Sequence, residues 1–91
     1  MPPIALPAIL DQRTVEAARD LLSEALAAGD VVVDAAGVER VNTVGLHLIL
    51  SAGETAREAG RRFVVSSPSA VVLDAISALG LGPRFSTWIE A

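Results

Sequence analysis

DVVVDAAGVERVNTVGLHLIL, residues 30–50, joins a run of β-branched residues to a segment with helical spacing. Asp30-Val31-Val32-Val33-Asp34 is typical of a strand that is buried on both faces. A turn is expected around Gly37, and a helix from about Thr43 to Ala59, with Gly60 as its stop. The inner face of this helix is predicted to hold Leu46, Ile49, Leu50, Gly53 and Ala56.

The residues before this stretch predict a strand and a first helix. The strand is half-buried, because its apolar residues recur at period two. Pro3 and Pro7 place it at a sheet edge, since proline cannot donate to a strand ladder. In the helix, Thr14 is the expected N-cap and Gly29 the stop. The apolar positions are Ile4, Leu6, Ala8 and Leu10 in the strand and Val15, Ala18, Leu22, Ala25 and Leu26 in the helix.

The residues after this stretch predict another strand and a third helix. Residues 63–66, Phe-Val-Val-Ser, have strand composition. Ser67 is the expected cap of the following helix, Pro68 its first residue and Gly80 its stop. Its apolar positions are Val71, Val72, Ala75, Ile76 and Leu79. Beyond it we expect a turn at Gly82 and Pro83 and a last short strand through Phe85 and Ile89, with Phe85 and Trp88 closing the core.

The alternation of strands and helices predicts an α/β fold. Parallel neighbours in a sheet are joined by crossovers, usually helical. The sheet is therefore expected to be largely parallel or mixed, with three or four strands and three main helices. Since 91 residues suffice for one core and 52% are hydrophobic, residues 1–91 are predicted to form a single domain.

The charge balance limits the possible partners. Seven basic residues, all Arg, stand against eleven acidic ones, and the net charge is −4. The chain therefore lacks the positive field that non-specific nucleic-acid binding requires. No segment approaches the ~20 continuous apolar residues of a membrane helix, and the N-terminus lacks the pattern of a secretory signal. With no Cys as well, we expect a cytoplasmic protein that binds no nucleic acid and does not insert into a membrane.

Residues suited to catalysis are scarce. The chain has one His and no Cys, Tyr or Lys, and it contains no phosphate-loop or dinucleotide motif. His47 could accept a phosphoryl group, but without partners it is expected to be an ordinary helix residue. Arg57, Arg61 and Arg62 are predicted to form a solvated helix end, where positive charge offsets the macrodipole, and not an anion site. We expect no enzymatic activity, no cofactor and no metal site.

A hydroxyl group at the start of the second helix is the candidate functional group. Thr43 is predicted in the first turn, beside unpaired backbone N–H groups and the positive end of the helix dipole. A phosphate attached there would be held by the same donors and would change which partner can bind. Alternatively, Asn42 or Thr43 simply caps the helix, which contributes ~1 kcal/mol. Local physics alone favours capping.

The order of elements and the segment Asn42-Thr43-Val44-Gly45-Leu46 resemble the STAS family, which is named for sulfate transporters and anti-sigma factor antagonists. The family motif is usually Asp, then Ser or Thr, then a small residue, then Gly-Leu. Asn42 and Val44 depart from that pattern. The resemblance runs from Ile4 to Trp88, and it is supported by Asp11, by Asp34 and by Ser67-Pro68-Ser69.

This resemblance implies a phosphorylation switch. In the anti-sigma factor antagonist branch, a partner kinase that is also the anti-sigma factor phosphorylates the hydroxyl residue, and phosphorylation breaks the complex. Thr43 is then the phospho-acceptor, and the partner-binding residues are Asn42, Thr43, Val44, Gly45 and His47. Gly45 would permit close backbone approach, with helix–sheet packing as the alternative role.

The segment before the first helix is shorter than in most members of the family. About a dozen residues precede that helix, which is too few for the two N-terminal strands of most members. A shortened strand region would leave an open sheet edge, which favours pairing with another chain, for example in a homodimer.

Other branches of the family imply other partners. The same motif resembles the small STAS accessory subunit of a phospholipid-transporting bacterial ABC system, which sits on an ATPase subunit. It also resembles the stand-alone STAS proteins of bacterial chemotaxis clusters. A small-molecule sensor for nucleotides or lipids is a different class, and its ligand would raise the thermal stability. The sequence thus predicts a non-enzymatic regulatory binding module and leaves its partner open.

Overall fold

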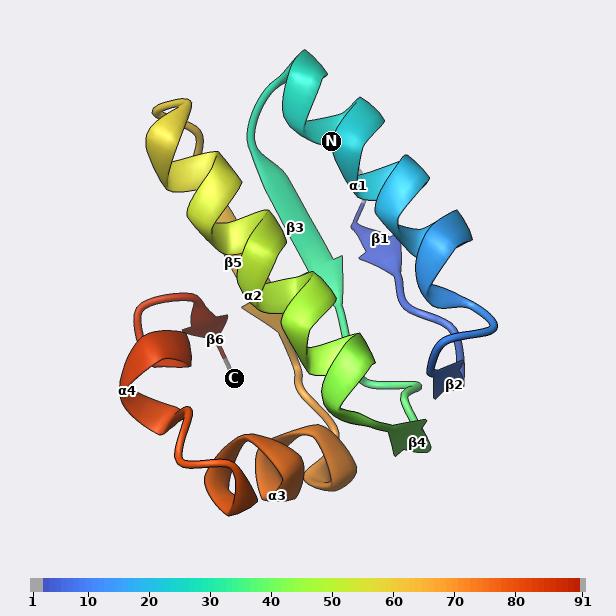
Figure 1. The fold of residues 1–91 in the computed structure, drawn as a ribbon. Coiled ribbons are helices and arrows are strands. Elements are labelled where there is room, and N and C mark those ends of the chain that lie inside the picture. Colours follow the sequence, from blue (N-terminus) through green and yellow to red (C-terminus); the bar gives the residue numbers. More distant parts are fainter. Residues whose placement is uncertain (1–2, 91) are drawn as a thin grey trace.

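The computed structural model describes residues 3–90, which form helices packed on parallel strands (Figure 1). The elements in chain order are β1 Ile4–Ala5, β2 Ile9–Leu10, α1 Val15–Ala28, β3 Val31–Asp34, β4 Arg40–Val41, α2 Thr43–Glu58, β5 Phe63–Ser66, α3 Ala70–Ala78, α4 Gly82–Phe85 and β6 Ile89–Glu90. Within residues 3–90, no helix combines the length and the apolar character needed to cross a membrane.

Every strand pairing in the described chain is parallel, which confirms the predicted α/β class. The main sheet has the order β1-β3-β5-β6, and a second ladder joins β2 to β4. In the main sheet Val33 of β3 lies opposite Ile4 of β1 and Val65 of β5. Figure 1 shows α1 and α2 side by side in front of this sheet, running in the same direction.

The core lies between the main sheet and these two helices. Val31 and Val33 of β3 are 1% and 0% exposed, and they meet buried leucines and an isoleucine of α1 and α2, among them Leu22, Leu46 and Ile49. Val32 is only half-buried. The two long helices both cover the face of the sheet that holds Val31 and Val33 (Figure 1). The prediction of a strand buried on both faces is therefore wrong for the face that holds Val32.

The N-terminal segment forms two short strands instead of the single strand predicted, so the expectation that the residues before α1 are too few for two strands is wrong. β1 pairs with β3 and β2 pairs with β4, so the two belong to different ladders. Between them Pro7 has no N–H group to donate, and the carbonyl of Ala8 accepts from the amides of Glu39 and Arg40 at 2.7 and 3.0 Å. The edge position of β1 is confirmed.

Two helix caps differ from the prediction. Thr14 precedes α1 but does not cap it, since its hydroxyl accepts from the amide of Asp11 at 3.1 Å and donates to the carbonyl of Ile9 at 2.8 Å. α3 is capped by Ser69, not by Ser67, whose φ of 50° lies in the left-handed region. The hydroxyl of Ser69 donates to the carbonyl of Val38 at 2.7 Å and accepts from the amide of Val72 at 3.4 Å.

The C-terminal segment closes the core, as predicted, but through a different element. Phe85 lies in the short helix α4, not in a strand, and only residues 89–90 form β6. Phe85 is fully buried. The ring of Trp88 meets those of Phe63 and Phe85 edge to face, with centroid distances of 5.6 and 5.7 Å, a geometry that aromatic pairs favour.

Gly53 of α2 makes room for this aromatic cluster, and replacing it tests the packing. A Cβ atom at position 53 would lie 2.5 Å from the indole ring of Trp88. We expect Gly53→Ala to lower the free energy of unfolding by about 1 kcal/mol or more in urea denaturation, because overpacking outweighs the better helix propensity of Ala. Gly37→Ala is the control, since a Cβ at position 37 meets nothing within 4 Å. Equal or greater stability of Gly53→Ala would contradict the packing.

Candidate functional site

The start of α2 is built by Asn42, which follows β4 in an extended conformation. Its side-chain oxygen accepts a hydrogen bond from the amide of Gly45 at 3.1 Å, and its carbonyl accepts from the amide of Leu46 at 3.1 Å. Asn42 is thus the N-cap residue. Of the two capping residues that the sequence allowed, the structure selects Asn42.

Thr43 is left free by this arrangement. It is the first residue of the 16-residue helix α2, it is exposed, and its hydroxyl makes no hydrogen bond within residues 3–90. The N–H groups of Thr43 and Val44 have no carbonyl of the helix to bind, because they lie in the first turn. An exposed and unbonded hydroxyl therefore stands beside unpaired donors at the positive end of the helix dipole.

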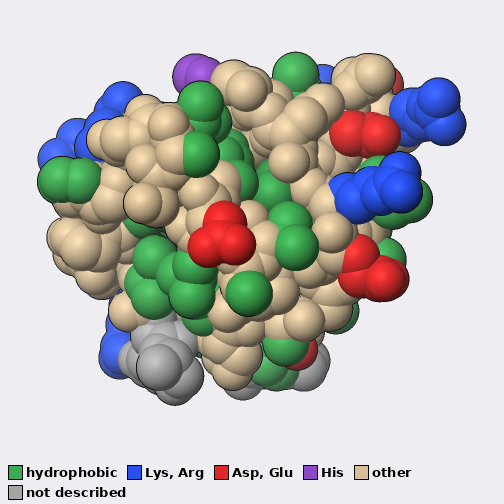
Figure 2. All heavy atoms as spheres, turned by 90° about the horizontal axis from the view of Figure 1, so that it is seen from below, with side chains coloured by type: hydrophobic (Ala, Val, Ile, Leu, Met, Phe, Trp, Pro, Cys, Tyr) green, Lys and Arg blue, Asp and Glu red, His purple; other side chains and the backbone are tan. Residues whose placement is uncertain are grey.

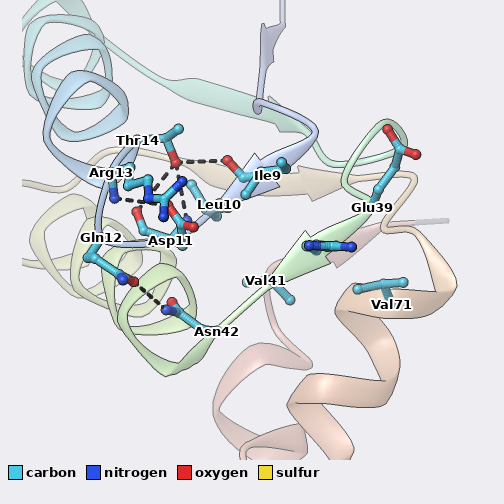
Figure 3. Close-up of a pocket in the computed structure, with 11 residues that line it drawn as sticks. Ile9, Leu10, Asp11, Gln12, Arg13, Thr14, Glu39, Val41, Asn42 and Val71 are labelled. Atoms are coloured by element: carbon cyan, nitrogen blue, oxygen red, sulfur yellow. Dashed lines mark hydrogen bonds between the residues drawn. The ribbon is translucent and has the colours of Figure 1, made fainter.

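Gln12 supports the cap from a distant part of the chain. Its side-chain carbonyl oxygen accepts from the Nδ2 group of Asn42 at 2.9 Å, and Figure 3 shows the two side chains pointing toward each other. The parallel pairing of β2 with β4 brings the residues together, because both strands end at the same edge. Sequence reasoning missed Gln12. No local signal marks a contact between residues that are 30 positions apart.

A hollow of about 720 Å³ opens beside the cap (Figure 3). It lies between residues 9–14, the strand β4 and the first turn of α3. Asp11 and Glu39 face Arg13 and Arg40 around it, so its lining has no excess of either charge. Two of its lining residues, Ile9 and Val71, are large hydrophobic side chains that are 45% and 38% exposed.

Gly45 is buried and carries the close contact between α2 and β2. A Cβ atom at this position would lie 2.6 Å from the carbonyl oxygen of Leu10 and 2.9 Å from its Cγ. Backbone atoms cannot yield easily, so any larger residue would push the start of α2 away from β2. Of the two roles expected for Gly45, the structure therefore shows helix–sheet packing, in which the backbone of α2 lies close to Leu10.

The remaining residues of the predicted site lie on the first two turns of α2. Val44 is 44% exposed, and His47 is exposed one turn beyond Thr43. Asp34 lies at the end of β3, where its carboxylate accepts from the amide of Ala36 at 3.0 Å. Within residues 3–90, His, Asp and Glu side chains form no group of three that could hold a metal ion. Partner binding by Asn42, Thr43, Val44, Gly45 and His47 stays a prediction.

Comparison with known proteins gives a matching family model and matching solved structures. The model of a family described as "Mlab, STAS domain" matches residues 2–85. The solved structure of the anti-sigma factor antagonist SpoIIAA in its unphosphorylated form superposes with a TM-score of 0.73 at 22% sequence identity. The match covers 94% of this chain and 74% of that one. At this identity the second match shows a shared fold. No curated protein sequence matches the chain.

Replacing Asn42 tests the cap. Asn42→Ala removes the oxygen that accepts from Gly45, and we expect it to lower the free energy of unfolding by about 1 kcal/mol in urea denaturation. Asn42→Asp is the matched control. It keeps an acceptor oxygen and adds a favourable charge at the helix start, which offsets the loss of the Nδ2 donor to Gln12, so its stability should lie within about 0.5 kcal/mol of wild type. Equal losses in both variants would contradict capping by Asn42.

Proposed function

This chain belongs to the STAS domain family, and on that premise we propose that it is a non-enzymatic regulatory module that binds a protein partner through the start of α2. The binding surface comprises the exposed residues Asn42, Thr43, Val44 and His47, with Gly45 buried beneath them, and phosphorylation of Thr43 switches it. The partner is a kinase that is also an anti-sigma factor, or a chemotaxis component, in the cytoplasm of a bacterium. The exposed and unbonded hydroxyl of Thr43 carries this proposal.

The surroundings of Thr43 suit both states of such a switch. In the transfer step, the Thr43 oxygen bonds to the γ-phosphorus of ATP held by the kinase, ADP leaves, and the hydroxyl proton passes to the kinase. The new phosphate lies near the unpaired amides of the first turn, which favour negative charge. Val44, next to Thr43, is 44% exposed. A partner that covers it would have to bury the nearly two negative charges of the phosphate, so the complex breaks.

Asn42 supports the switch without the carboxylate usual in the family. It keeps the cap on Gly45 and the bond to Gln12. The first turn of α2 contains no acidic residue, so no negative charge there opposes a phosphate on Thr43. The departure from the family motif is therefore compatible with phosphorylation.

A second candidate is constitutive binding as an accessory subunit of a phospholipid-transporting ABC system. The description of the matching family model, "Mlab, STAS domain", favours it. Exposed apolar side chains near the start of α2, Ile9, Val44 and Val71, would suit a contact that needs no switching. In this case Thr43 is a contact residue on the ATPase subunit, and its phosphorylation plays no part.

A small-molecule sensor is a third candidate, favoured by the hollow of about 720 Å³ next to Asn42. That volume lies in the range of ligand pockets. Nucleotides or lipids that bind there would raise the melting temperature of the protein, and an unchanged melting temperature with both classes would exclude this candidate.

Intact-mass measurement and partner binding test the switch. The protein is incubated with the kinase from its native cells and ATP. We expect the mass of one added phosphoryl group on wild type and none on Thr43→Ala. Thr43→Glu should weaken partner binding by about tenfold or more, or ~1.4 kcal/mol, whereas Thr43→Ser should bind as wild type does.

Two results would contradict phosphorylation switching and leave constitutive binding in its place. They are an unchanged mass of the wild-type protein and equal partner affinity of Thr43→Glu and Thr43→Ser. A phosphoryl group that persists in Thr43→Ala would place the modification on another residue and overturn the assignment of Thr43.

A further inference from the structure

We propose that a hollow at the other end of α2, between its last turns and the segment that leads into β6, binds a phosphate-bearing anion. This hollow has a volume of about 320 Å³. Since α2 has 16 residues, the hollow lies on the order of 20 Å from Thr43. It is therefore separate from the surface of residues 42–47, and its ligand does not depend on the function proposed there.

Among the side chains that the structure describes, the charged ones that line the hollow are all guanidinium groups. They belong to Arg57, Arg61 and Arg62. Three of the seven basic residues of a chain with a net charge of −4 thus surround one hollow. Guanidinium groups form paired hydrogen bonds with the oxygens of phosphate and of carboxylate. A phosphate has more oxygens than a carboxylate, so it can bond several guanidinium groups at once.

The nearby acidic residue Glu54 does not neutralise this lining. Its carboxylate is shared between Arg57 at 2.7 Å and Arg84 at 3.2 Å, so one negative charge faces two positive ones. The guanidinium of Arg61 has no hydrogen bond or ion pair within residues 3–90. An anionic ligand would supply a partner for that group.

The neutral part of the lining offers donors and an apolar surface. The indole N–H of Trp88 donates no hydrogen bond within the described residues, and Thr87 is exposed beside it. The Trp88 ring is held in place by Phe63 and Phe85, and it lies close to the Cα atom of Gly53. A rigid ring with an unbonded N–H group, next to the guanidinium of Arg61, suits a phosphate group attached to a small organic part.

Stabilisation of the helix end explains only part of this cluster. Arg57 lies in the last turn of α2, where a positive charge offsets the macrodipole. Gly60 then adopts a left-handed conformation with φ of 70°, and the amide of Arg61 donates back to the carbonyl of Ala56 at 2.8 Å. This turn carries Arg61 and Arg62 past the helix end, to positions that line the hollow with Trp88. The arginines predicted from the sequence to form a solvated helix end thus line one side of the hollow.

The chain contains one tryptophan, so Trp88 fluorescence reports on this hollow directly. The probes are inorganic phosphate, glycerol 3-phosphate, and vesicles of phosphatidylglycerol with phosphatidylcholine vesicles as the uncharged reference. We expect a saturable change in Trp88 fluorescence with at least one anionic probe, and weaker binding at higher salt. Arg61→Glu should weaken that binding at least tenfold, and Arg61→Gln should weaken it less.

Arg19→Glu is the matched control, because it makes the same change of charge on the exposed face of α1, away from this hollow. Saturation by a soluble probe identifies a free phosphate compound as the ligand, and saturation by phosphatidylglycerol vesicles alone identifies a lipid headgroup. No saturable change with any anionic probe, or equal weakening by Arg19→Glu and Arg61→Glu, would overturn the proposal. Circular dichroism verifies the fold of each variant, and Thr43→Ala should bind as wild type does.

Discussion

The parallel pairing of β3 with β1 on one side and β5 on the other is the constraint on which the rest of the structure depends. It sets Ile4, Val33 and Val65 in one row under α1 and α2, and the burial of that row supplies the apolar contacts that hold the layers together. Parallel strands also end at a common edge, so the loops that follow them lie near one another. The same property of the separate ladder of β2 and β4 brings Gln12 next to Asn42 and so builds the site at the start of α2.

Helix α2 links the two surfaces discussed above, and each of its ends has a different chemistry. At the start, Asn42 satisfies the amide of Gly45 and leaves the hydroxyl of Thr43 exposed. At the end, arginine side chains line a hollow together with a tryptophan ring. Two buried glycines fix the helix between these ends, since Gly45 lies against Leu10 and Gly53 against Trp88. Figure 2 shows a third feature, the face that contains α3, where hydrophobic side chains gather around an acidic one.

Hydroxyl residues show where local reasoning fails. Thr14 and Ser67 each precede a helix and have the residue type of a cap. Their predicted roles were wrong because Thr14 binds the carbonyl of Ile9, while Ser69 has a tertiary partner in Val38 and takes the cap of α3. The same limit applies to β4, whose two residues pair with β2 across about 30 positions of sequence. Short strands of this kind are defined by their partner and not by their own composition.

The sequence by itself determined the identity and order of the main helices and the strands β3 and β5, because apolar spacing and helix-stopping glycines are local properties of the chain. It also placed Asn42 and Thr43 at the start of a helix. Only the tertiary structure decided that Asn42 caps while Thr43 stays free, that Gln12 holds the cap, and that arginines line a hollow with Trp88. These outcomes depend on contacts between residues far apart in the chain, and such contacts leave no periodic signal in the sequence.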